Sequence, residues 1–297
     1  MIDKPGIYKL NDEEYHADPC EAPSLSRGII HTLITSTPAH ARFQHPRLNP
    51  LWAPEEKTLF DLGKAAHALL LQGEGIAEVC DFPTWKSNKA KEAREEARLA
   101  GKVPLLIHQY EDTLLMVKSA REQIAASDLP VKDLLTEGDA ELAYIWQEGE
   151  AWLRVKPDFI SHKKVCDARK LVLDYKTTGE TADPASFVKS AIGKAYDIQV
   201  SLYKRGIQAV EGGKPPRFVF MIQENYPPFL MSFICLDHAT QEMGKQKVEI
   251  GKAIWEKCLY LNEWPGYSKR IATAECPTWA MSQWEDKSAT LGVMEDE

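Results

Sequence analysis

The chain has 297 residues, of which 44% are hydrophobic and 27% are charged, and its formal net charge is −8. This composition is ordinary for a globular protein and is sufficient for one large domain or two small ones. No apolar run reaches the length of about 18 residues that a membrane span requires. The acidic balance argues mildly against a protein coated for nucleic-acid binding, although a nuclease with a local basic groove can still be acidic overall.

The cysteines indicate the redox compartment. Six are present, scattered without a C-x-x-C pair, and the N-terminus has no apolar core of a signal peptide. In a chain of this length we expect reduced thiols and a cytoplasmic location.

The first 136 residues are expected to be mainly helical after a turn-rich lead-in over residues 1–23. Ser24 and Ser26 are candidate N-caps for the first helix, and Pro38 ends or restarts it. The further helices are predicted over residues 57–72, which read as largely buried, 86–102, 108–126, and a short segment between Pro130 and Leu135.

A stretch without acidic residues runs from Ala22 to Pro54. Its basic and imidazole side chains are Arg27, His31, His40, Arg42, His45 and Arg47. Such a bias is compatible with a surface that faces phosphate. It is equally compatible with a solvated helix that lacks acids by chance.

From residue 137 the hydrophobic period changes to two, which is typical of strands. The predicted order is three strands, a helix, two strands and a helix, which indicates an α/β fold with a mixed central sheet flanked by helices. The predicted strands are Glu141–Gln147, Ala151–Ile160, Val165–Thr178, Arg217–Gln223 and Phe229–Leu236. The helices are expected from Asp183 to Gly212, with a break near Gly193, and from Ala239 to Leu261, before a polar and mobile end.

The third strand carries the chemically informative residues. Asp174 and Lys176 are two apart, so a strand points both to one face, whereas Tyr175 points to the other. Asp158 follows Pro157, which fits a strand end or a bulge. Two carboxylates and a lysine are what metal-assisted phosphodiester hydrolysis requires. By spacing alone, ordinary surface charges are about equally compatible.

Two helices carry further candidates. Gly63 and His67 are four apart and share a face of the predicted helix 57–72, and Gln199 and Tyr203 share a face of the helix that follows the third strand. A lone histidine on an apolar helix is more often a hydrogen-bonded core residue than a ligand, and a Gln-x-x-x-Tyr pair is common on helix surfaces.

These motifs, in this order along the chain, resemble those of a known nuclease family. The chain is similar to the RecB-like branch of the PD-(D/E)xK nuclease superfamily, and within it to the RecE-type exonucleases, over roughly residues 5–280. Further similar segments are Gly-Ile-Tyr-Lys-Leu-Asn-Asp-Glu-Glu-Tyr-His near the start, and Asn-Glu-Trp-Pro-Gly-Tyr and Cys-Pro-Thr-Trp-Ala near the end. The ordered motifs are Gly63-x-x-x-His67, Pro157-Asp158, Asp174-x-Lys176 and Gln199-x-x-x-Tyr203.

The resemblance implies roles for these residues. His67, Asp158 and Asp174 match metal ligands, with the Tyr175 carbonyl as a further oxygen ligand. The catalytic set would be Asp158, Asp174, Lys176, Gln199 and Tyr203, with Glu141 as a weaker candidate for a second metal or a water. DNA contacts are expected from Arg27, Arg42, Arg154, Thr177 and Thr178.

It also implies an organisation and partners. The whole chain, 1–297, would be a single nuclease domain with a helical part (1–136), a catalytic core (137–280) and a polar tail (281–297). The enzyme would use Mg²⁺, or Mn²⁺ in its place, and would degrade linear duplex DNA from the 5′ end. The expected partners are DNA ends, a RecT-type annealing protein and further copies in a ring, in the cytoplasm of a bacterium that carries a phage or prophage. Cys258 and Cys276 are not tightly clustered, so no iron–sulfur cluster is expected.

Three alternatives stay open. The first is a RecB-like nuclease of other polarity, which acts on single strands or internally. The second is a DNA-binding module that reuses the fold without cutting, against which the intact Asp158, Asp174 and Lys176 argue. The third is a phosphoesterase that acts on a small nucleotide.

Overall fold

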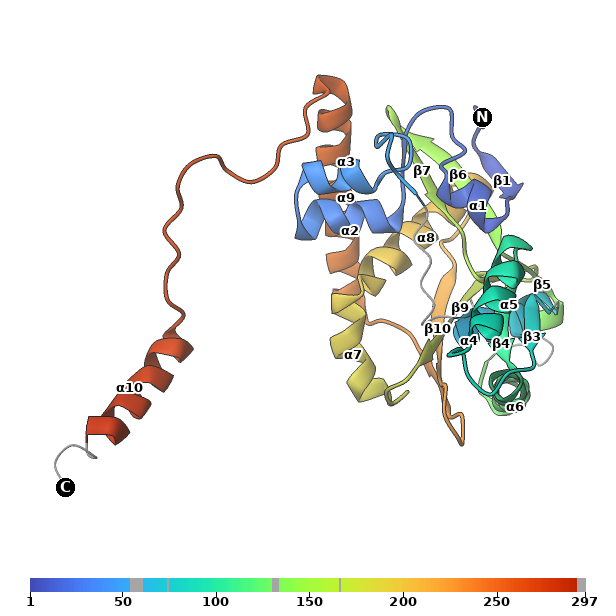
Figure 1. Cartoon of the computed structure of the whole chain (residues 1–297). Helices are drawn as coiled ribbons and strands as arrows, with labels where there is room; N and C mark the ends of the chain where they lie inside the picture. Colours follow the sequence, from blue (N-terminus) through green and yellow to red (C-terminus); the bar gives the residue numbers. More distant parts are fainter. Residues whose placement is uncertain (54–60, 74, 130–133, 166, 293–297) are drawn as a thin grey trace. The chain divides into compact units, whose positions relative to one another are not determined.

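The computed structural model describes residues 1–53, 61–73, 75–129, 134–165 and 167–292. The chain forms two compact units, Met1–Pro265 and Gly266–Glu297. Figure 1 shows the elements of both. Within the described ranges, no helix is long and apolar enough to cross a bilayer.

A five-stranded mixed sheet lies at the centre of the larger unit, as expected. Its order is β11-β10-β9-β8-β5, in which β9 and β10 are parallel and the other neighbours antiparallel. Leu171, Val172 and Leu173 of β9 are completely buried because helices cover both faces of this sheet. The strands are β5 (Gly138–Ala140), β8 (Phe159–Ser161), β9 (Leu171–Thr178), β10 (Arg217–Glu224) and β11 (Met231–Ile234).

Two further sheets accompany it. The order β1-β6-β7-β2 forms a four-stranded sheet, and β3 pairs with β4 in a short parallel sheet that the sequence pattern did not predict. Their strands are β1 (Gly6–Lys9), β2 (Ser24–Leu25), β3 (Ala77–Cys80), β4 (Val103–Leu106), β6 (Leu142–Glu148) and β7 (Ala151–Val155).

The prediction of one continuous strand from Ala151 to Ile160 is wrong. The chain leaves the four-stranded sheet after β7 and enters the central sheet at β8, and Pro157 and Asp158 lie at this crossing. Proline has no N–H to continue a strand ladder, which explains the break. A second, similar break separates β5 from β6 at Glu141, whose φ is +59°. The Glu141 N–H donates to the Asp158 carbonyl at 3.3 Å, so the two crossings lie side by side.

The helices largely follow their expected starts and stops. Ser26 precedes α2, Pro38 begins α3, and Asp183 caps α7 by accepting from the Ser186 N–H. Gly212 follows the last residue of α8. The helices of the larger unit are α1 (Asp12–His16), α2 (Arg27–Thr35), α3 (Pro38–Gln44), α4 (Asp61–His67), α5 (Asn88–Leu99), α6 (Ile107–Ala126), α7 (Pro184–Gly193), α8 (Tyr196–Glu211) and α9 (His238–Leu261).

Two predicted helices differ from the structure. Helix α4 ends at His67, and the chain continues as one π-helical turn, Ala68–Gln72, instead of a regular helix to residue 72. Residues 57–60 of that prediction lie outside the described ranges. Of the short helix before Leu135, the described part is a single 3₁₀ turn, Leu134–Thr136, and Pro130 is outside the description.

The two faces of the central sheet are covered by different helices. Val172, Phe218 and Phe220 face the core that contains residues of α7, α8 and α9. Leu173 and Met221 face the core built with α4 and α6. Figure 1 shows α7 and α8 on one side of β9 and β10, and α4 and α6 on the other. Polar residues that follow in β9 therefore emerge between these two helical layers.

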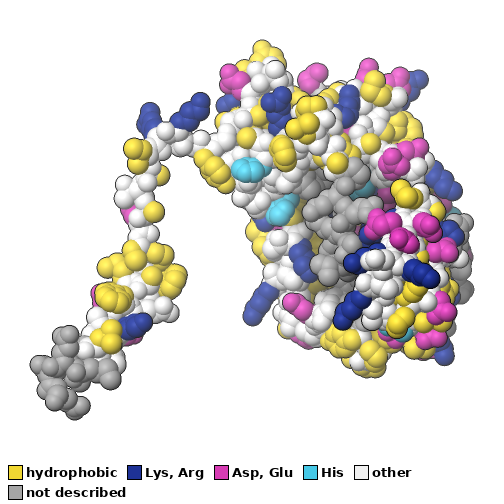
Figure 2. Space-filling model, in the orientation of Figure 1, with side chains coloured by type: hydrophobic (Ala, Val, Ile, Leu, Met, Phe, Trp, Pro, Cys, Tyr) yellow, Lys and Arg dark blue, Asp and Glu magenta, His cyan; other side chains and the backbone are white. Residues whose placement is uncertain are grey.

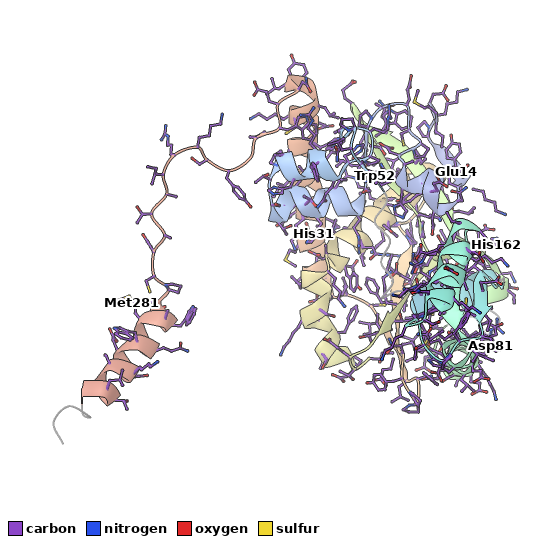
Figure 3. The ribbon with its side chains drawn as sticks, viewed as in Figure 1. Glu14, His31, Trp52, Asp81, His162 and Met281 are labelled. Carbon is purple, nitrogen blue, oxygen red and sulfur yellow. The ribbon has the colours of Figure 1, made fainter. Side chains whose placement is uncertain are left out.

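The smaller unit contains α10 (Thr278–Gly292). The described part of the expected polar tail (281–297) is helical up to Gly292, and its mobility stays a prediction. Large apolar side chains are exposed there, including Trp279 (65%) and Trp284 (63%). Figure 2 shows hydrophobic side chains gathered on this helix, and Figure 3 labels Met281 among them.

Candidate active site

Asp158 is positioned by the crossing between the two sheets. One of its carboxylate oxygens, Oδ2, accepts from the Tyr175 N–H at 2.8 Å and lies 3.1 Å from His67 Nε2. Lys176 Nζ lies 3.8 Å from the same oxygen. These groups fix the orientation of the carboxylate, whose side chain remains partly open to solvent.

His67 enters the site at the end of α4, where the regular helix changes to the π-helical turn. The helix approaches β9 closely at Gly63, where an added Cβ would lie 2.7 Å from Thr177 Oγ1. Glycine is needed at such a close approach because any side chain would collide. The predicted pairing of Gly63 and His67 on one helix face therefore has a structural purpose: the glycine brings the imidazole to the sheet.

Glu141 completes a group that could hold a cation. Its Oε1 lies 3.5 Å from His67 Nε2, and one donor atom from each of His67, Glu141 and Asp158 lies within 4.8 Å of the others. Two carboxylates and an imidazole suit a divalent cation such as Mg²⁺ or Mn²⁺. The weaker sequence candidate, Glu141, thus belongs to the group, because the break after β5 places it beside Asp158.

Asp174 and Lys176 point to one face of β9, as their spacing predicts. Lys176 Nζ lies 2.5 Å from Asp174 Oδ1, and the Gln199 amide donates to Asp174 Oδ2. Asp174 is completely buried and is not part of the His67–Glu141–Asp158 group. Its metal-ligand role stays a prediction, whereas the contacts of its carboxylate hold Lys176 and α8 in place.

The site charges shift one another's protonation. Burial alone would raise the pKa of Asp158, but Lys176 and His67 lower it below its ordinary value. Burial and the negative charge of Asp158 raise the pKa of Asp174. Burial would lower the pKa of Lys176, but the two aspartates outweigh it and raise that pKa. Lys176 is therefore a cation at neutral pH and not a free base.

The remaining predicted catalytic residues surround this centre. The Tyr175 hydroxyl donates to Gln223 Oε1 at 2.6 Å on the buried face of β9. Because the N–H and C=O of one strand residue point to the same edge, its carbonyl faces the side on which Asp158 lies. Gln199 also accepts from Arg27 Nη1 at 3.0 Å. Tyr203 lines the cavity and packs edge-on against Phe218.

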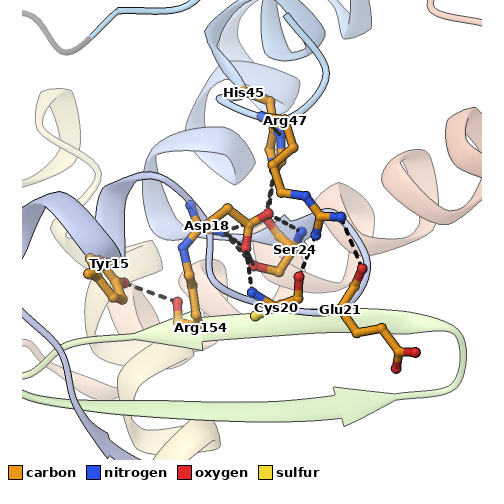
Figure 4. A network of polar contacts seen from close by, with 8 residues as sticks. All are labelled: Tyr15, Asp18, Cys20, Glu21, Ser24, His45, Arg47 and Arg154. Atoms are coloured by element: carbon orange, nitrogen blue, oxygen red, sulfur yellow. Dashed lines mark hydrogen bonds and ion pairs between the residues drawn. The ribbon is translucent and has the colours of Figure 1, made fainter. Parts of the chain in front are cut away.

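Arg154 lines the catalytic cavity and is also held in a buried polar network, and its contact with DNA stays a prediction. The side chain is only 3% exposed, and its Nη1 lies 3.0 Å from Asp18 Oδ1 and donates to the Ser24 carbonyl at 2.8 Å. Figure 4 shows this buried network, which also includes His45, 3.2 Å from Asp18 Oδ2. The charge of Arg154 is thus neutralised inside the fold.

Of the other residues predicted to contact DNA, some line the catalytic cavity and some lie outside it. Arg27 and Thr177 line the catalytic cavity. Arg42 is exposed on α3 and is not among the cavity residues. The Thr178 hydroxyl accepts from the Glu180 N–H at 3.0 Å, as in a turn. Their contacts with DNA stay predictions.

Some basic residues of the acid-free stretch from Ala22 to Pro54 make contacts within the fold. Arg47 donates to the carbonyls of Cys20 and Glu21, and His45 is completely buried. His31, labelled in Figure 3, is half-buried on α2. Only Arg27 of its basic residues lines the catalytic cavity.

The cavity around these residues has a volume of about 850 Å³. It opens between the N-terminal region, α4, the two sheet crossings and α8, so residues from distant parts of the sequence line it. Its lining includes Arg27, Gly63, His67, Glu141, Arg154, Asp158, Tyr175, Lys176, Thr177, Gln199 and Tyr203.

The sequence interpretation missed Lys156. Its Nζ lies 2.9 Å from Glu141 Oε2 and 2.6 Å from Asp12 Oδ1, so it links the N-terminal helix α1 to the site. Lys156 lies two residues before Asp158, which was a usable signal. The break at Pro157, however, prevents a spacing argument from placing the two side chains together.

Comparisons with solved structures bear on the fold. A crystal structure of a candidate exonuclease from Eubacterium rectale matches with a TM-score of 0.54 and 10% identity, covering 92% of this chain and 98% of that chain. At this identity the likeness shows the fold. The crystal structure of SSO0001 matches with a TM-score of 0.28 and 12% identity, over 66% of this chain and 85% of that one. No curated protein sequence matches.

A family model establishes the relationship. The model described as "PDDEXK-like domain of unknown function (DUF3799)" matches residues 33–276, which include every residue of the central site from His67 to Tyr203. The restriction-endonuclease-like α/β core expected from the sequence is therefore confirmed, and the site supports a nuclease. The chain belongs to the PDDEXK-like DUF3799 family.

Proposed function

We propose that this protein is a Mg²⁺-dependent exodeoxyribonuclease that degrades linear double-stranded DNA from 5′ to 3′ and leaves 3′ single-stranded tails. The observation that carries the proposal is the convergence of His67, Glu141 and Asp158, with Lys176 beside Asp158. Carboxylates next to a lysine suit phosphodiester hydrolysis, and the family is PDDEXK-like. The RecE-like sequence motifs support the polarity.

His67, Glu141 and Asp158 would hold the divalent cation, which when bound polarises a phosphate oxygen and lowers the pKa of a water. The chain's own residues supply the positioning. The Tyr175 N–H keeps Asp158 oriented before substrate arrives. Lys176, a cation at neutral pH, would orient the attacking water and offset charge on the phosphate.

Gln199 and Arg27 extend this arrangement toward the substrate. The Gln199 amide bridges the Asp174 carboxylate and the Arg27 guanidinium. Through this bridge, Arg27 is fixed on the wall of the cavity, where it would contact a backbone phosphate of the DNA. Such a contact is independent of sequence and weakens with salt.

The wider role follows the same resemblance. The 3′ tails would serve recombination by strand annealing, with a RecT-type protein as partner and a ring of several copies as the working assembly in the cytoplasm. Mn²⁺ would replace Mg²⁺, because the same oxygen and imidazole ligands suit both ions.

The test uses linear duplex DNA labelled separately at its 5′ and 3′ ends. We expect progressive loss from the 5′ end that requires Mg²⁺ and is abolished by EDTA. Asp158→Asn and Lys176→Ala should each reduce the rate by ~10²-fold or more, the order expected when one preorganised contact to the transition state is lost. The matched control is Lys189→Ala, an exposed lysine on α7 away from the cavity residues.

The outcomes separate the alternatives. Loss from the 3′ end, or internal cutting, would keep the site and overturn the polarity. A fully active Lys176→Ala variant would contradict the site itself. Metal-independent binding of DNA without any cleavage would favour a non-catalytic binding module.

A further inference from the structure

A second cavity of about 670 Å³ lies on the other side of α8 from the catalytic cavity. Tyr196, Gln199 and Tyr203 of α8 line the catalytic cavity, whereas other positions of the same helix line the second one. Its further walls come from β10, the end of β11 and the start of α9. The lining residues are Arg169, Ser201, Lys204, Arg205, Gln208, Pro215, Arg217, Phe218, Cys235, Leu236, His238, Gln241, Lys245, Val248 and Glu249.

Lysines and arginines make up five of the fifteen residues of this lining, although the chain as a whole carries a net charge of −8. The cations are Arg169, Lys204, Arg205, Arg217 and Lys245, and the one carboxylate in the lining, Glu249, lies 2.5 Å from Arg205 Nη1. Arg205 also pairs with Glu148, and Lys245 Nζ lies 2.8 Å from Glu242 Oε2, so acids outside the lining offset part of this positive charge.

Two of these cations lack an acidic partner within the described part of the chain. Lys204 Nζ donates to the neutral amide oxygen of Gln241 at 2.7 Å. Arg169 Nε is buried and has no hydrogen-bond partner there. Burial lowers the pKa of Lys204, and the positive charges of Arg169 and Lys245 lower it further, because neighbouring cations disfavour the charged ammonium. An anion in the cavity would relieve this repulsion.

The shape of the cavity narrows the class of anion. Its volume lies within the ~300–1,000 Å³ that is usual for small-ligand sites. Phe218, Leu236 and Val248 are buried and supply an apolar wall beside the cations. A phosphate group offers several acceptor oxygens to lysine and arginine at once, and a base or sugar attached to it could pack against the apolar wall.

We propose that the cavity around Lys204 and Arg169 is a phosphate-binding site, separate from the catalytic centre, that takes the phosphates of a nucleotide or of a nucleic-acid strand. The proposal does not depend on the nuclease assignment, because none of its residues belongs to the catalytic group.

The experiment measures binding directly in the full-length chain carrying Lys176→Ala, in EDTA, so that no DNA is cut. One arm titrates inorganic pyrophosphate by calorimetry, and the other titrates fluorescein-labelled oligo-dT by anisotropy. Lys204→Gln and Arg169→Gln are added to this background. The matched control is Lys189→Gln on α7, and circular dichroism checks that each variant is folded.

We expect Lys204→Gln and Arg169→Gln each to weaken binding by about tenfold, the effect of losing one charge-assisted hydrogen bond, and Lys189→Gln to leave it unchanged. Loss in the pyrophosphate arm would identify free phosphate compounds as the ligands, and loss in the oligonucleotide arm alone would identify a strand. The proposal is overturned if folded Lys204→Gln and Arg169→Gln bind both probes as their parent does, or if the parent binds neither. Cleavage by the wild-type chain is scored separately, so failure of the nuclease proposal would be seen independently.

Discussion

Asp158 illustrates how the site residues are restrained before any cation or substrate binds. Its Oδ2 accepts the Tyr175 N–H, lies near His67 Nε2, and is within 3.8 Å of Lys176 Nζ. Each of these groups stabilises the ionised carboxylate, which explains why its pKa is lowered despite burial. A carboxylate that is ionised and fixed in orientation needs little rearrangement to ligate a cation.

His67 makes cation binding pH-dependent. Burial alone would lower its pKa, but Asp158 and Glu141 outweigh it and raise the pKa above 6.5. The imidazole must lose a proton before Nε2 can ligate, so we expect Mn²⁺ affinity to rise as the pH increases through this raised pKa, above 6.5. Calorimetry should show this rise flattened in His67→Gln and retained in His162→Gln, an exposed histidine paired with Asp139. An unchanged pH profile in His67→Gln would remove His67 from the ligands.

The sequence predicted some site contacts and could not predict others. The two-residue spacing of Asp174 and Lys176 was sufficient, because both lie in one regular strand. The positions of Glu141 and Lys156 in the site depend on where the chain crosses from one sheet to another. That crossing is set by tertiary pairing, which no local period encodes.

At the scale of elements, α8 connects the catalytic cavity to the rest of the fold. Tertiary pairing also limited the prediction of the strands. Pro157 indicated a break, but the sequence pattern could not show that β7 and β8 belong to different sheets. Capping residues and glycines predicted the helix ends better, because Asp183 before α7 and Gly212 after α8 act through local contacts. The position of α8 against α9 depends on a buried site at which the backbones of the two helices come close together.

Gly244 of α9 provides that approach. An added Cβ would lie 2.1 Å from the Asp197 carbonyl oxygen in α8, and backbone cannot rotate away. We expect Gly244→Ala to lower the free energy of unfolding by about 1–3 kcal/mol and to reduce cleavage, because α8 carries Gln199. The matched control is Gly193→Ala, where an added Cβ meets nothing within 4 Å. Urea denaturation measures both, and equal stability of the two variants would contradict the packing account.

At the scale of the whole molecule, acidic residues outnumber basic ones. A net charge of −8 repels DNA at long range, so the proposed contacts with DNA would rely on cations that line the cavities. Figure 2 shows acidic and basic side chains interspersed over one face of the larger unit. Short-range phosphate contacts of this kind are screened by salt, which makes ionic strength a necessary control in every assay described above.

The division into two units predicts what a shortened chain retains. Both main hydrophobic clusters and all residues that line the catalytic cavity lie within Met1–Pro265. A chain ending at Pro265, whose carbonyl accepts from the Ala39 N–H at 3.1 Å, should keep its free energy of unfolding within about 0.5 kcal/mol of the full-length value. It should also keep Mg²⁺-dependent cleavage of a short duplex. Urea denaturation and single-turnover cleavage, each run beside the full-length chain, measure the two effects. Loss of cleavage with stability retained would mean that residues 266–297 act on the DNA or on assembly, whereas loss of both would mean that the larger unit needs them to fold.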